Sequence, residues 1–477
     1  MKPTKALLVS TVAASLAAVA LTGGAARAGN LSSYDGASWY GKYLSVSSGT
    51  TAAACAGSLG QPRYGTNVDA GHECGSQSET YIATNASGNV VIAGSNEIQR
   101  LPMRAMASTD GGSTFTGADL PLPPPVTSGG SDFGSDPTIA FDSHGTAYYG
   151  YIVVFFSAGG AINGTEMAVA RSSDNGLSWR STFFAPQTGS GQFNDKPMIT
   201  VDTSAAHRDR IYLAWDNATG NSSSVMNGNN VVLSSSDDGG VSFTAPMSVS
   251  GDFQGRTGAI GADPYLTPAG VLHVAWQDVA HGAIVDVSST DGGRTFSARH
   301  IVAAVNGFDF AVAAMASRSA LVYPSCGAYQ ATLYCAYTNG SSTATSVYVA
   351  TSKDGGTTWS SSAVPAGGDQ FNQWLAVDAS TGAVDVAYYD TGTHGATATR
   401  YTLARSRPGG RFTATAVANA PTDESCCLPS VDLGNQYGDY EGLAAGGGNV
   451  HPVWTDRRQA VVDLGLREEV FTATLAS

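Results

Sequence analysis

Ser108-Thr109-Asp110-Gly111-Gly112-Ser113-Thr114-Phe115 is an eight-residue stretch that recurs along the chain as Ser-x-Asp-x-Gly-x-x-aromatic. Four further copies keep the serine, the aspartate, the glycine and the aromatic residue: Ser172–Trp179, Ser236–Phe243, Ser289–Phe296 and Ser352–Trp359. The five aspartates are 64, 64, 53 and 63 residues apart. A fixed period of this length predicts a modular repeat architecture.

Each copy predicts a turn after a strand. A β-rich run such as Met167–Arg171 precedes the pattern. The aspartate can accept backbone N–H hydrogen bonds and the glycine adopts a positive φ, as tight turns require. We therefore expect these aspartates to be structural rather than catalytic, and the closing Trp or Phe to pack between neighbouring units.

The five stretches resemble the Asp-box, or BNR, repeat of sialidase-like β-propellers. With their flanking strands they extend over almost the whole chain that follows the N-terminal segment. The resemblance implies an all-β fold of four-stranded blades, with each box forming the turn between the third and fourth strands. The 58 glycines, the many serines and threonines and the few lysines and glutamates are typical of such a turn-rich β-protein.

The number of blades follows from the short strands that open each repeat. Seven openings are present: Thr80–Asn85, Pro137–Asp142, Pro197–Asp202, Pro264–Thr267, Phe310–Ser317, Trp374–Asp378 and Tyr440–Ala444. They predict seven blades, with six as the alternative if the first or fifth opening is a loop. The sixth repeat keeps a degenerate box, Ser406–Phe412, and the seventh ends after its third strand. We expect the N-terminal segment, where Tyr43–Val46 is strand-like, to close the last blade.

The beginning of the chain reads as a secretory signal peptide. Lys2 and Lys5 precede an apolar stretch, and Ala26-Arg27-Ala28 is a small-x-small cleavage site. No later segment approaches the roughly 18 apolar residues of a membrane-spanning helix. We expect a signal peptide at 1–28, an N-terminal segment at 29–75 and the propeller at 76–477, in a soluble protein that is secreted or periplasmic after cleavage near Ala28.

Net charge argues against some classes of binding partner, and the cysteine content indicates disulfides. Without Lys2, Lys5 and Arg27 the chain has 21 basic and 38 acidic residues, a net charge of −17. This charge argues against nucleic acid and anionic membranes as partners, and we expect a monomer without membrane insertion. Six cysteines in an exported chain indicate disulfides. Cys55/Cys74 and Cys326/Cys335 are the favoured pairs, whereas Cys426-Cys427 allows either a vicinal disulfide or two separate bridges.

Polar residues recur at the start of each inner strand, on the face of the propeller opposite the boxes. They are Glu79, Asp136, Asp195, Asp263, Asp309, Asn372 and Asp439. A second set follows the second strands: Glu97, Asp216, Asp278, Asp390 and Asp456. Crowded carboxylates raise one another's pKa or bind a cation, so Asp136, Asp195, Asp263 and Asp439 are candidate Ca²⁺ ligands. The alternative is that they cap strand starts.

Resemblance to sialidases implies three arginines that bind a substrate carboxylate, a tyrosine nucleophile with a glutamate beside it, and an aspartic acid as general acid/base. An arginine suits a carboxylate because it donates two parallel hydrogen bonds. The arginines able to reach the channel mouth are Arg100, Arg256, Arg400, Arg457 and Arg458. The candidate site is Arg100, Arg256 and Arg457 with Asp136, Tyr440 and Glu441. The family's first arginine opens the first blade, whereas Gln99-Arg100-Leu101-Pro102 lies eight residues before the first box.

Other chemistries lack support in the sequence. It contains no zinc-binding spacing, no Gly-x-Ser-x-Gly and no phosphate-binding loop. The leading prediction is a glycan-directed glycoside hydrolase of the sialidase-like kind, acting with a carboxylate pair at the channel mouth. The alternative is a non-catalytic propeller that binds a glycan or a protein and holds a structural cation.

Overall fold

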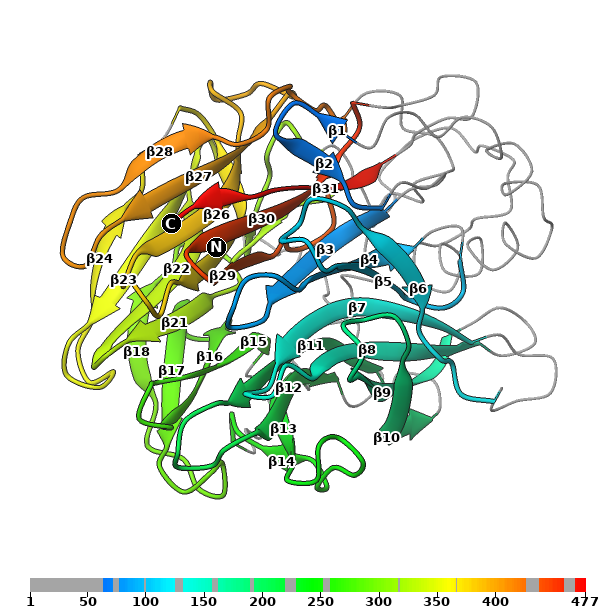
Figure 1. Ribbon diagram of the computed structural model, residues 1–477. Helices are drawn as coiled ribbons and strands as arrows, with labels where there is room; N and C mark the ends of the chain where they lie inside the picture. The colour runs from blue at the N-terminus through cyan, green and yellow to red at the C-terminus, as the bar shows by residue number, and fades with distance from the viewer. Residues whose placement is uncertain are drawn as a thin grey trace.

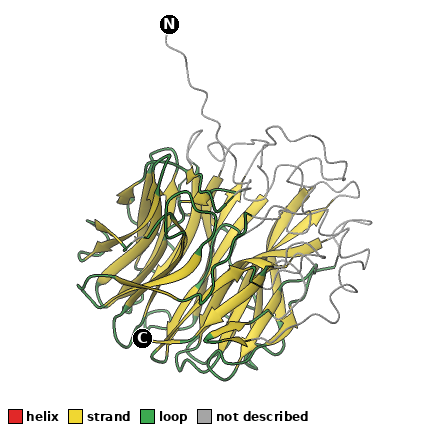
Figure 2. Cartoon of the chain, turned by 90° about the horizontal axis from the view of Figure 1, so that it is seen from above, coloured by secondary structure: helices red, strands yellow, loops and turns green. Residues whose placement is uncertain are grey.

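The computed structural model describes residues 63–71, 77–97, 100–124, 132–156, 162–188, 193–218, 229–251, 258–315, 318–365, 367–425, 437–458 and 468–477. These residues form strands, turns and loops without a helix (Figure 2). Seven antiparallel sheets of at least four strands follow one another in chain order as the blades of a β-propeller (Figure 1). This architecture confirms the all-β class and seven blades, and excludes the six-bladed alternative.

The first four blades are antiparallel meanders in which consecutive strands pair. Blade 1 contains β3 (Gln77–Thr84), β4 (Val91–Glu97), β5 (Arg104–Ser108) and β6 (Thr116–Asp119). Blade 2 contains β7 (Asp132–Phe141), β8 (Ala147–Phe156), β9 (Ile162–Ser172) and β10 (Arg180–Thr188). Blade 3 contains β11 (Phe193–Asp202), β12 (Arg210–Ala218), β13 (Asn229–Ser236) and β14 (Met247–Ser248). Blade 4 contains β15 (Ala259–Leu266), β16 (Leu272–Asp278), β17 (Ala283–Ser289) and β18 (His300–Ala304).

The remaining blades follow the same plan until the ring closes. Blade 5 contains β21 (Ser325–Tyr329), β22 (Thr332–Gly340), β23 (Thr345–Ser352) and β24 (Ser360–Ala363). Blade 6 contains β25 (Gln370–Val377), β26 (Val384–Asp390), β27 (Arg400–Ser406) and β28 (Thr413–Ala416). Blade 7 contains β29 (Leu443–Gly446), β30 (Asn449–Asp456) and β31 (Glu469–Ala473), with β32 (Leu475–Ala476) paired to β30.

Blade 7 takes its outer strands from the beginning of the chain. β2 (Asn67–Asp69) pairs with β31, and β1 (Arg63–Tyr64) pairs with β2. Figure 1 shows blue β2 beside red β31. Residues 67–69 and the C-terminal strand β31 are therefore joined by backbone hydrogen bonds within one sheet, which closes the ring. Tyr43–Val46, the segment that we expected in this place, lies outside the described residues.

The five boxes lie between the third and fourth strands of blades 1 to 5, as expected. In the second box, Asp174 accepts hydrogen bonds from the hydroxyl of Ser172 at 2.7 Å and from the backbone N–H of Ser178 at 3.0 Å. The backbone N–H of Gly176 donates to Ser172 Oγ at 2.9 Å. Hydrogen bonds from Ser178 and then Ser172 lower the pKa of Asp174 to about 2. The Asp side chain is thus used to hold its own turn.

Apolar side chains fill the spaces between blades. Phe243, which closes the third box, stacks on Phe184 of blade 2 with ring centroids 4.2 Å apart. The second strands contribute the large buried residues Trp215, Trp276 and Trp454. Apolar packing of this kind repeats around the ring, and the largest apolar cluster is continuous from Met198 of blade 3 to Phe471 of blade 7.

The opening expected at Phe310–Ser317 is wrong, because the inner strand of blade 5 is β21. Phe310 lies in the hairpin of β19 (Asp309–Phe310) and β20 (Ala320–Leu321), which connects blades 4 and 5. Phe310, Val312 and Ala314 alternate as buried residues, and this pattern imitates a half-buried strand. They are part of the apolar core that also contains residues of blades 4 and 5.

A disulfide joins Cys326 of β21 to Cys335 of β22, which confirms this predicted pair. The other four cysteines, Cys55, Cys74, Cys426 and Cys427, lie outside the described residues. In the described part of the chain we find no helix long and apolar enough to cross a membrane.

Candidate functional site at the propeller axis

Five inner strands carry a β-bulge at the same point, where their pairing with the second strand shifts. The first bulged residues all have positive φ: Glu79 (52°), Asp136 (61°), Lys196 (45°), Gly261 (72°) and Asn372 (48°). A bulge redirects a side chain away from the strand's alternation. Positive φ is unfavourable for residues other than glycine, and such backbone conformations concentrate at functional sites. Four of these five positions nevertheless carry polar or charged side chains.

The side chain of Lys196 locates the axis of the propeller. Its Nζ lies 4.7 Å from the ring centroid of Tyr323, 5.1 Å from that of Tyr440 and 5.6 Å from that of Trp374. Lys196 belongs to blade 3, whereas these rings belong to the inner edges of blades 5, 7 and 6. Side chains of four blades can meet only where the blades converge.

Two glycines make room for this arrangement. A Cβ at Gly261 would lie 2.2 Å from the ring of Tyr323, and a Cβ at Gly438 would lie 2.0 Å from Cγ of Glu79. Both glycines also have positive φ, 72° and 73°. The absence of a side chain at these positions lets neighbouring blades place Tyr323 and Glu79 at the axis.

Hydrogen bonds and ion pairs connect the acidic residues across blades. Asn96 Nδ2 donates to Glu79 at 2.6 Å, and Asn96 Oδ1 accepts the backbone N–H of Asp136 at 2.7 Å. The N–H of Asp439 donates to Glu79 at 3.1 Å. The guanidinium of Arg318 is 3.4 Å from Glu79 and also pairs with Asp439. Blades 7, 1 and 2 and the blade 4–5 connection therefore share one polar network.

Burial changes the proton affinity of these groups. It raises the pKa of Asp195, which the negative charge of Asp136 raises further. Burial also raises the pKa of Asp216 and of Asp263 to about 7, against hydrogen bonds from backbone N–H groups. Burial lowers the pKa of Lys196, and four nearby carboxylates oppose this effect. At neutral pH the site can therefore contain both protonated and ionised carboxyl groups.

We call these residues the axial cluster: Glu79, Asp136, Asp195, Lys196, Asp216, Asp263, Arg318, Tyr323, Asn372, Trp374, Asp439 and Tyr440. It contains all four of the candidate calcium ligands, Asp136, Asp195, Asp263 and Asp439. Asp309 is not at an inner-strand start, because it lies in the β19–β20 hairpin. Of the second acidic set, Asp216 belongs to the cluster; Asp278 and Asp456 pair with Arg299 and Arg458.

The ammonium group of Lys196 supplies positive charge where the sequence predicted a calcium ion. Asp216, Asp263, Asp439 and Asp195 act on it electrostatically. In the described ranges, no group of three or more His, Cys, Asp or Glu side chains is arranged to hold a metal ion. The calcium site stays a prediction, and Lys196 and Arg318 are an alternative source of charge compensation.

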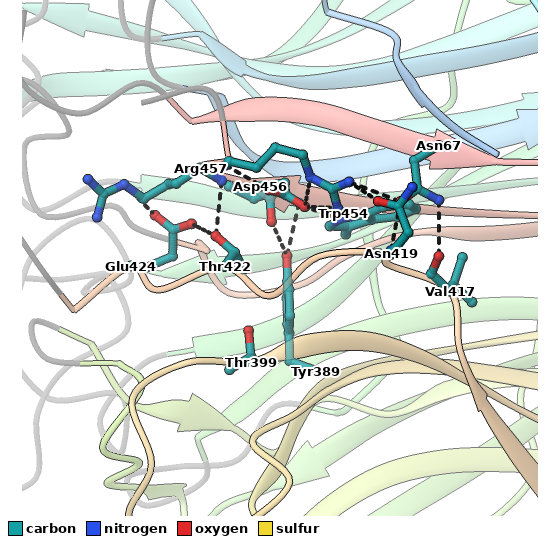
Figure 3. Close-up of polar contacts among 12 residues, drawn as sticks. Asn67, Tyr389, Thr399, Val417, Asn419, Thr422, Glu424, Trp454, Asp456 and Arg457 are labelled. Carbon is teal, nitrogen blue, oxygen red and sulfur yellow. Dashed lines mark hydrogen bonds and ion pairs between the residues drawn. The ribbon is translucent and has the colours of Figure 1, made fainter. Parts of the chain in front are cut away.

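The arginines considered from sequence have separate partners. Arg100 lies 3.4 Å from Asp119 of β6 and is a third exposed. Arg457, which follows β30, lies 3.6 Å from Glu424 (Figure 3). It also donates to the carbonyl of Asp423 at 2.8 Å. Arg256 lies outside the described residues. Arg100 and Arg457 thus pair with carboxylates in blade 1 and beside blade 7, whereas Arg318 joins the axial cluster.

The side chains of Tyr440 and Glu441, which precede β29, have different partners. The hydroxyl of Tyr440 donates to the carbonyl of Pro137 at 3.3 Å, at the axis. Glu441 instead accepts hydrogen bonds from the N–H of Thr80 at 3.2 Å and from the hydroxyl of Tyr389. Figure 3 shows Tyr389 directed toward blade 7 from blade 6. Tyr389 and Glu441 thus form a buried tyrosine–glutamate pair from two blades.

Sequence reasoning missed Lys196, Arg318, Tyr323 and Trp374 as site residues. One signal was available: the chain has only five lysines, and Lys196 stands between an aspartate and a proline at the start of an inner strand. Tyr323 and Trp374 carry no comparable signal, since isolated aromatic residues at strand starts are usual core residues.

Comparison with known proteins gives a repeat family and a set of propellers. The model of the BNR repeat-like domain matches residues 150–388, half of the chain. No curated protein matches this chain. An intramolecular trans-sialidase from Ruminococcus gnavus is similar with a TM-score of 0.48 and 13% identity, over 70% of this chain and 93% of that one. An α-L-arabinanase from Penicillium chrysogenum has a TM-score of 0.44 and 11% identity, over 83% and 92%.

Proposed function

Because the chain belongs to the BNR repeat-like domain family and is a sialidase-like β-propeller, we propose that it is a glycoside hydrolase that acts on a glycan at the axial cluster. The observation that carries this proposal is the group of carboxyls with different proton affinities. Glycoside hydrolysis requires one carboxylic acid to protonate the leaving oxygen and one carboxylate to act as base or nucleophile.

We assign the general acid and the base to two carboxyl groups of the axial cluster. Asp263, whose pKa burial raises to about 7, is the proposed general acid, since a large fraction of it is protonated at neutral pH. Asp439, which is paired with Arg318, is the proposed base. Asp136 shares the network with Asp195 and supports the charge balance of the site.

The sialidase mechanism itself is not part of the proposal. A tyrosine nucleophile must approach the phenolate form, yet burial and the nearby charges of Asp136 and Glu79 raise the pKa of Tyr440 well above its usual value. Arg100 and Arg457, which were expected to bind a substrate carboxylate, are engaged with Asp119 and Glu424. We therefore assign the chemistry to carboxyl groups.

The test is hydrolysis of a panel of aryl glycosides and polysaccharides by wild type and by Asp263→Asn. Removal of a general acid should lower kcat roughly 10²- to 10⁴-fold and abolish the basic limb of the pH profile. The matched control is Asp390→Asn, because Asp390 ends a second strand and binds the backbone N–H groups of Gly367 and Gly392. Equal loss in both variants, or no hydrolysis of any substrate, would overturn the proposal.

A non-catalytic glycan- or protein-binding propeller is the second candidate. The observation that favours it is the saturation of the acidic network by internal partners, for example Glu79 with Asn96, Asp439 and Arg318. Saturable binding to a glycan without any turnover would support this candidate.

We further propose that the protein is exported and acts as a monomer. The Cys326–Cys335 disulfide is compatible with an oxidising compartment. N-terminal sequencing of the secreted product should find cleavage near Ala28, and light scattering should give the mass of a single chain.

A further inference from the structure

Three buried polar atoms of the axial cluster have no hydrogen-bond partner among the described residues. They are Nζ of Lys196, the hydroxyl of Tyr323 and Oδ1 of Asn372. Their side chains belong to blades 3, 5 and 6, and each residue is at most 3% exposed. A buried polar atom without a partner costs free energy, so unpaired atoms at one place indicate a ligand or ordered water.

These atoms differ in hydrogen-bonding character. Lys196 provides donors, Asn372 an acceptor and Tyr323 a hydroxyl that can do either. Asn372 is oriented by its Nδ2, which donates to the carbonyl of Gly438 at 3.2 Å. A ligand that satisfies all three must itself carry both donors and acceptors. Hydroxyl groups have this property, and a sugar carries several of them.

Aromatic rings adjoin the same atoms. Nζ of Lys196 lies 5.6 Å from the ring centroid of Trp374 and 5.1 Å from that of Tyr440. Binding sites for small polar molecules commonly combine aromatic walls with a few placed polar groups. The C–H face of a sugar ring suits such walls, and its hydroxyl edge suits Lys196 and Asn372.

The charge of the cluster selects among sugars. Within the described chain it has six carboxyl groups, Glu79, Asp136, Asp195, Asp216, Asp263 and Asp439, and two cations, Lys196 and Arg318. Arg318 is already engaged by Glu79 and Asp439. A ligand carboxylate would therefore add negative charge to a buried site that already has an excess of acidic groups.

We propose that the axial cluster binds a neutral sugar through Lys196, Tyr323 and Asn372 and rejects sugars that carry a carboxylate. This inference rests on the proposed glycan-directed function and specifies its substrate class.

Matched sugar pairs test this inference by calorimetry or ligand-observed NMR on the full chain. Glucose with glucuronic acid, galactose with galacturonic acid, and mannose with mannuronic acid each differ only at C6. N-acetylneuraminic acid and neutral oligosaccharides complete the panel. We expect at least one neutral sugar to bind about tenfold or more tightly than its uronic acid, since one added buried charge is worth at least this factor.

Two variants locate the binding. Lys196→Met should weaken binding of the neutral sugar about tenfold, whereas the control Lys353→Met, in an exposed box residue, should leave it unchanged. Tyr323→Phe removes only the hydroxyl and keeps the ring, so it tests the same site if Lys196→Met does not fold.

The outcomes separate the two proposals. Uronic or neuraminic acid binding as tightly as the neutral sugars would overturn the inference and leave a glycan-directed protein. Neutral-sugar binding that is unaffected by Lys196→Met and by Tyr323→Phe would also overturn it. Failure of every sugar to bind and of every glycoside to be cleaved would overturn the proposed function as well.

Discussion

Replacing Asp174 with alanine should destabilise the propeller without changing its chemistry. The carboxylate accepts three hydrogen bonds, from Ser172 Oγ at 2.7 Å, from Ser178 N at 3.0 Å and from Ser178 Oγ at 2.5 Å. A hydrogen bond contributes about 0.5–1.5 kcal/mol, and because Asp174 is exposed the low end of this range, about 0.5 kcal/mol for each of the three bonds, applies. We expect the free energy of unfolding to fall by about 1–2 kcal/mol.

Urea unfolding followed by tryptophan fluorescence measures this change, because Trp179 closes the same box and is buried. In a chain of this length the thermal midpoint should fall by only about 1–2 °C, so chemical unfolding is the better assay. Leu177→Ala is the control. Leu177 belongs to the same turn, is 58% exposed and should change stability by less than about 0.5 kcal/mol.

The pH dependence gives a second signature. The folded pKa of Asp174, about 2, lies below the unfolded value of about 3.9. Its contribution is therefore fully present above about pH 4 and is lost as the pH falls toward 2. The difference between wild type and Asp174→Ala should shrink over this window. An equal loss in Leu177→Ala, a difference that does not depend on pH, or a loss of activity per folded molecule would refute a structural role for the box.

Two further predictions concern the axis. Gly438→Ala should destabilise by more than Gly448→Ala, because both have positive φ, 73° and 78°, but only Gly438 has a neighbour, Glu79 Cγ, at 2.0 Å from the added Cβ. Comparing their urea midpoints separates steric overlap from backbone strain, and equal losses would contradict the packing argument. Calcium should leave the thermal midpoint unchanged in wild type and in the Asp195→Asn/Asp263→Asn double variant, because Lys196 already supplies positive charge. A calcium-dependent rise in wild type alone would instead support the calcium site that the sequence predicts.

The sequence alone was sufficient for the repeat, whereas its preferred count of seven blades was right although one of the seven predicted openings was wrong. Each box is held by hydrogen bonds between residues at most four positions apart, such as Ser178 and Asp174, so its pattern is local and can be read directly. The inner strand predicted at Phe310–Ser317 was wrong. Alternation of apolar and polar residues indicates only which side chains are buried, and a buried connection between blades shows the same alternation as a strand.

The composition of the axial cluster was decided only by the tertiary structure. Lys196 meets Tyr323, Trp374 and Tyr440, which are more than 120 residues away along the chain. No local pattern encodes these contacts, because they depend on the closure of seven blades and on bulges that redirect single side chains toward the axis. The turns of the blades can therefore be predicted from sequence because their hydrogen bonds are local. Which residues share the site depends on strands that are distant in sequence and converge only in the folded propeller.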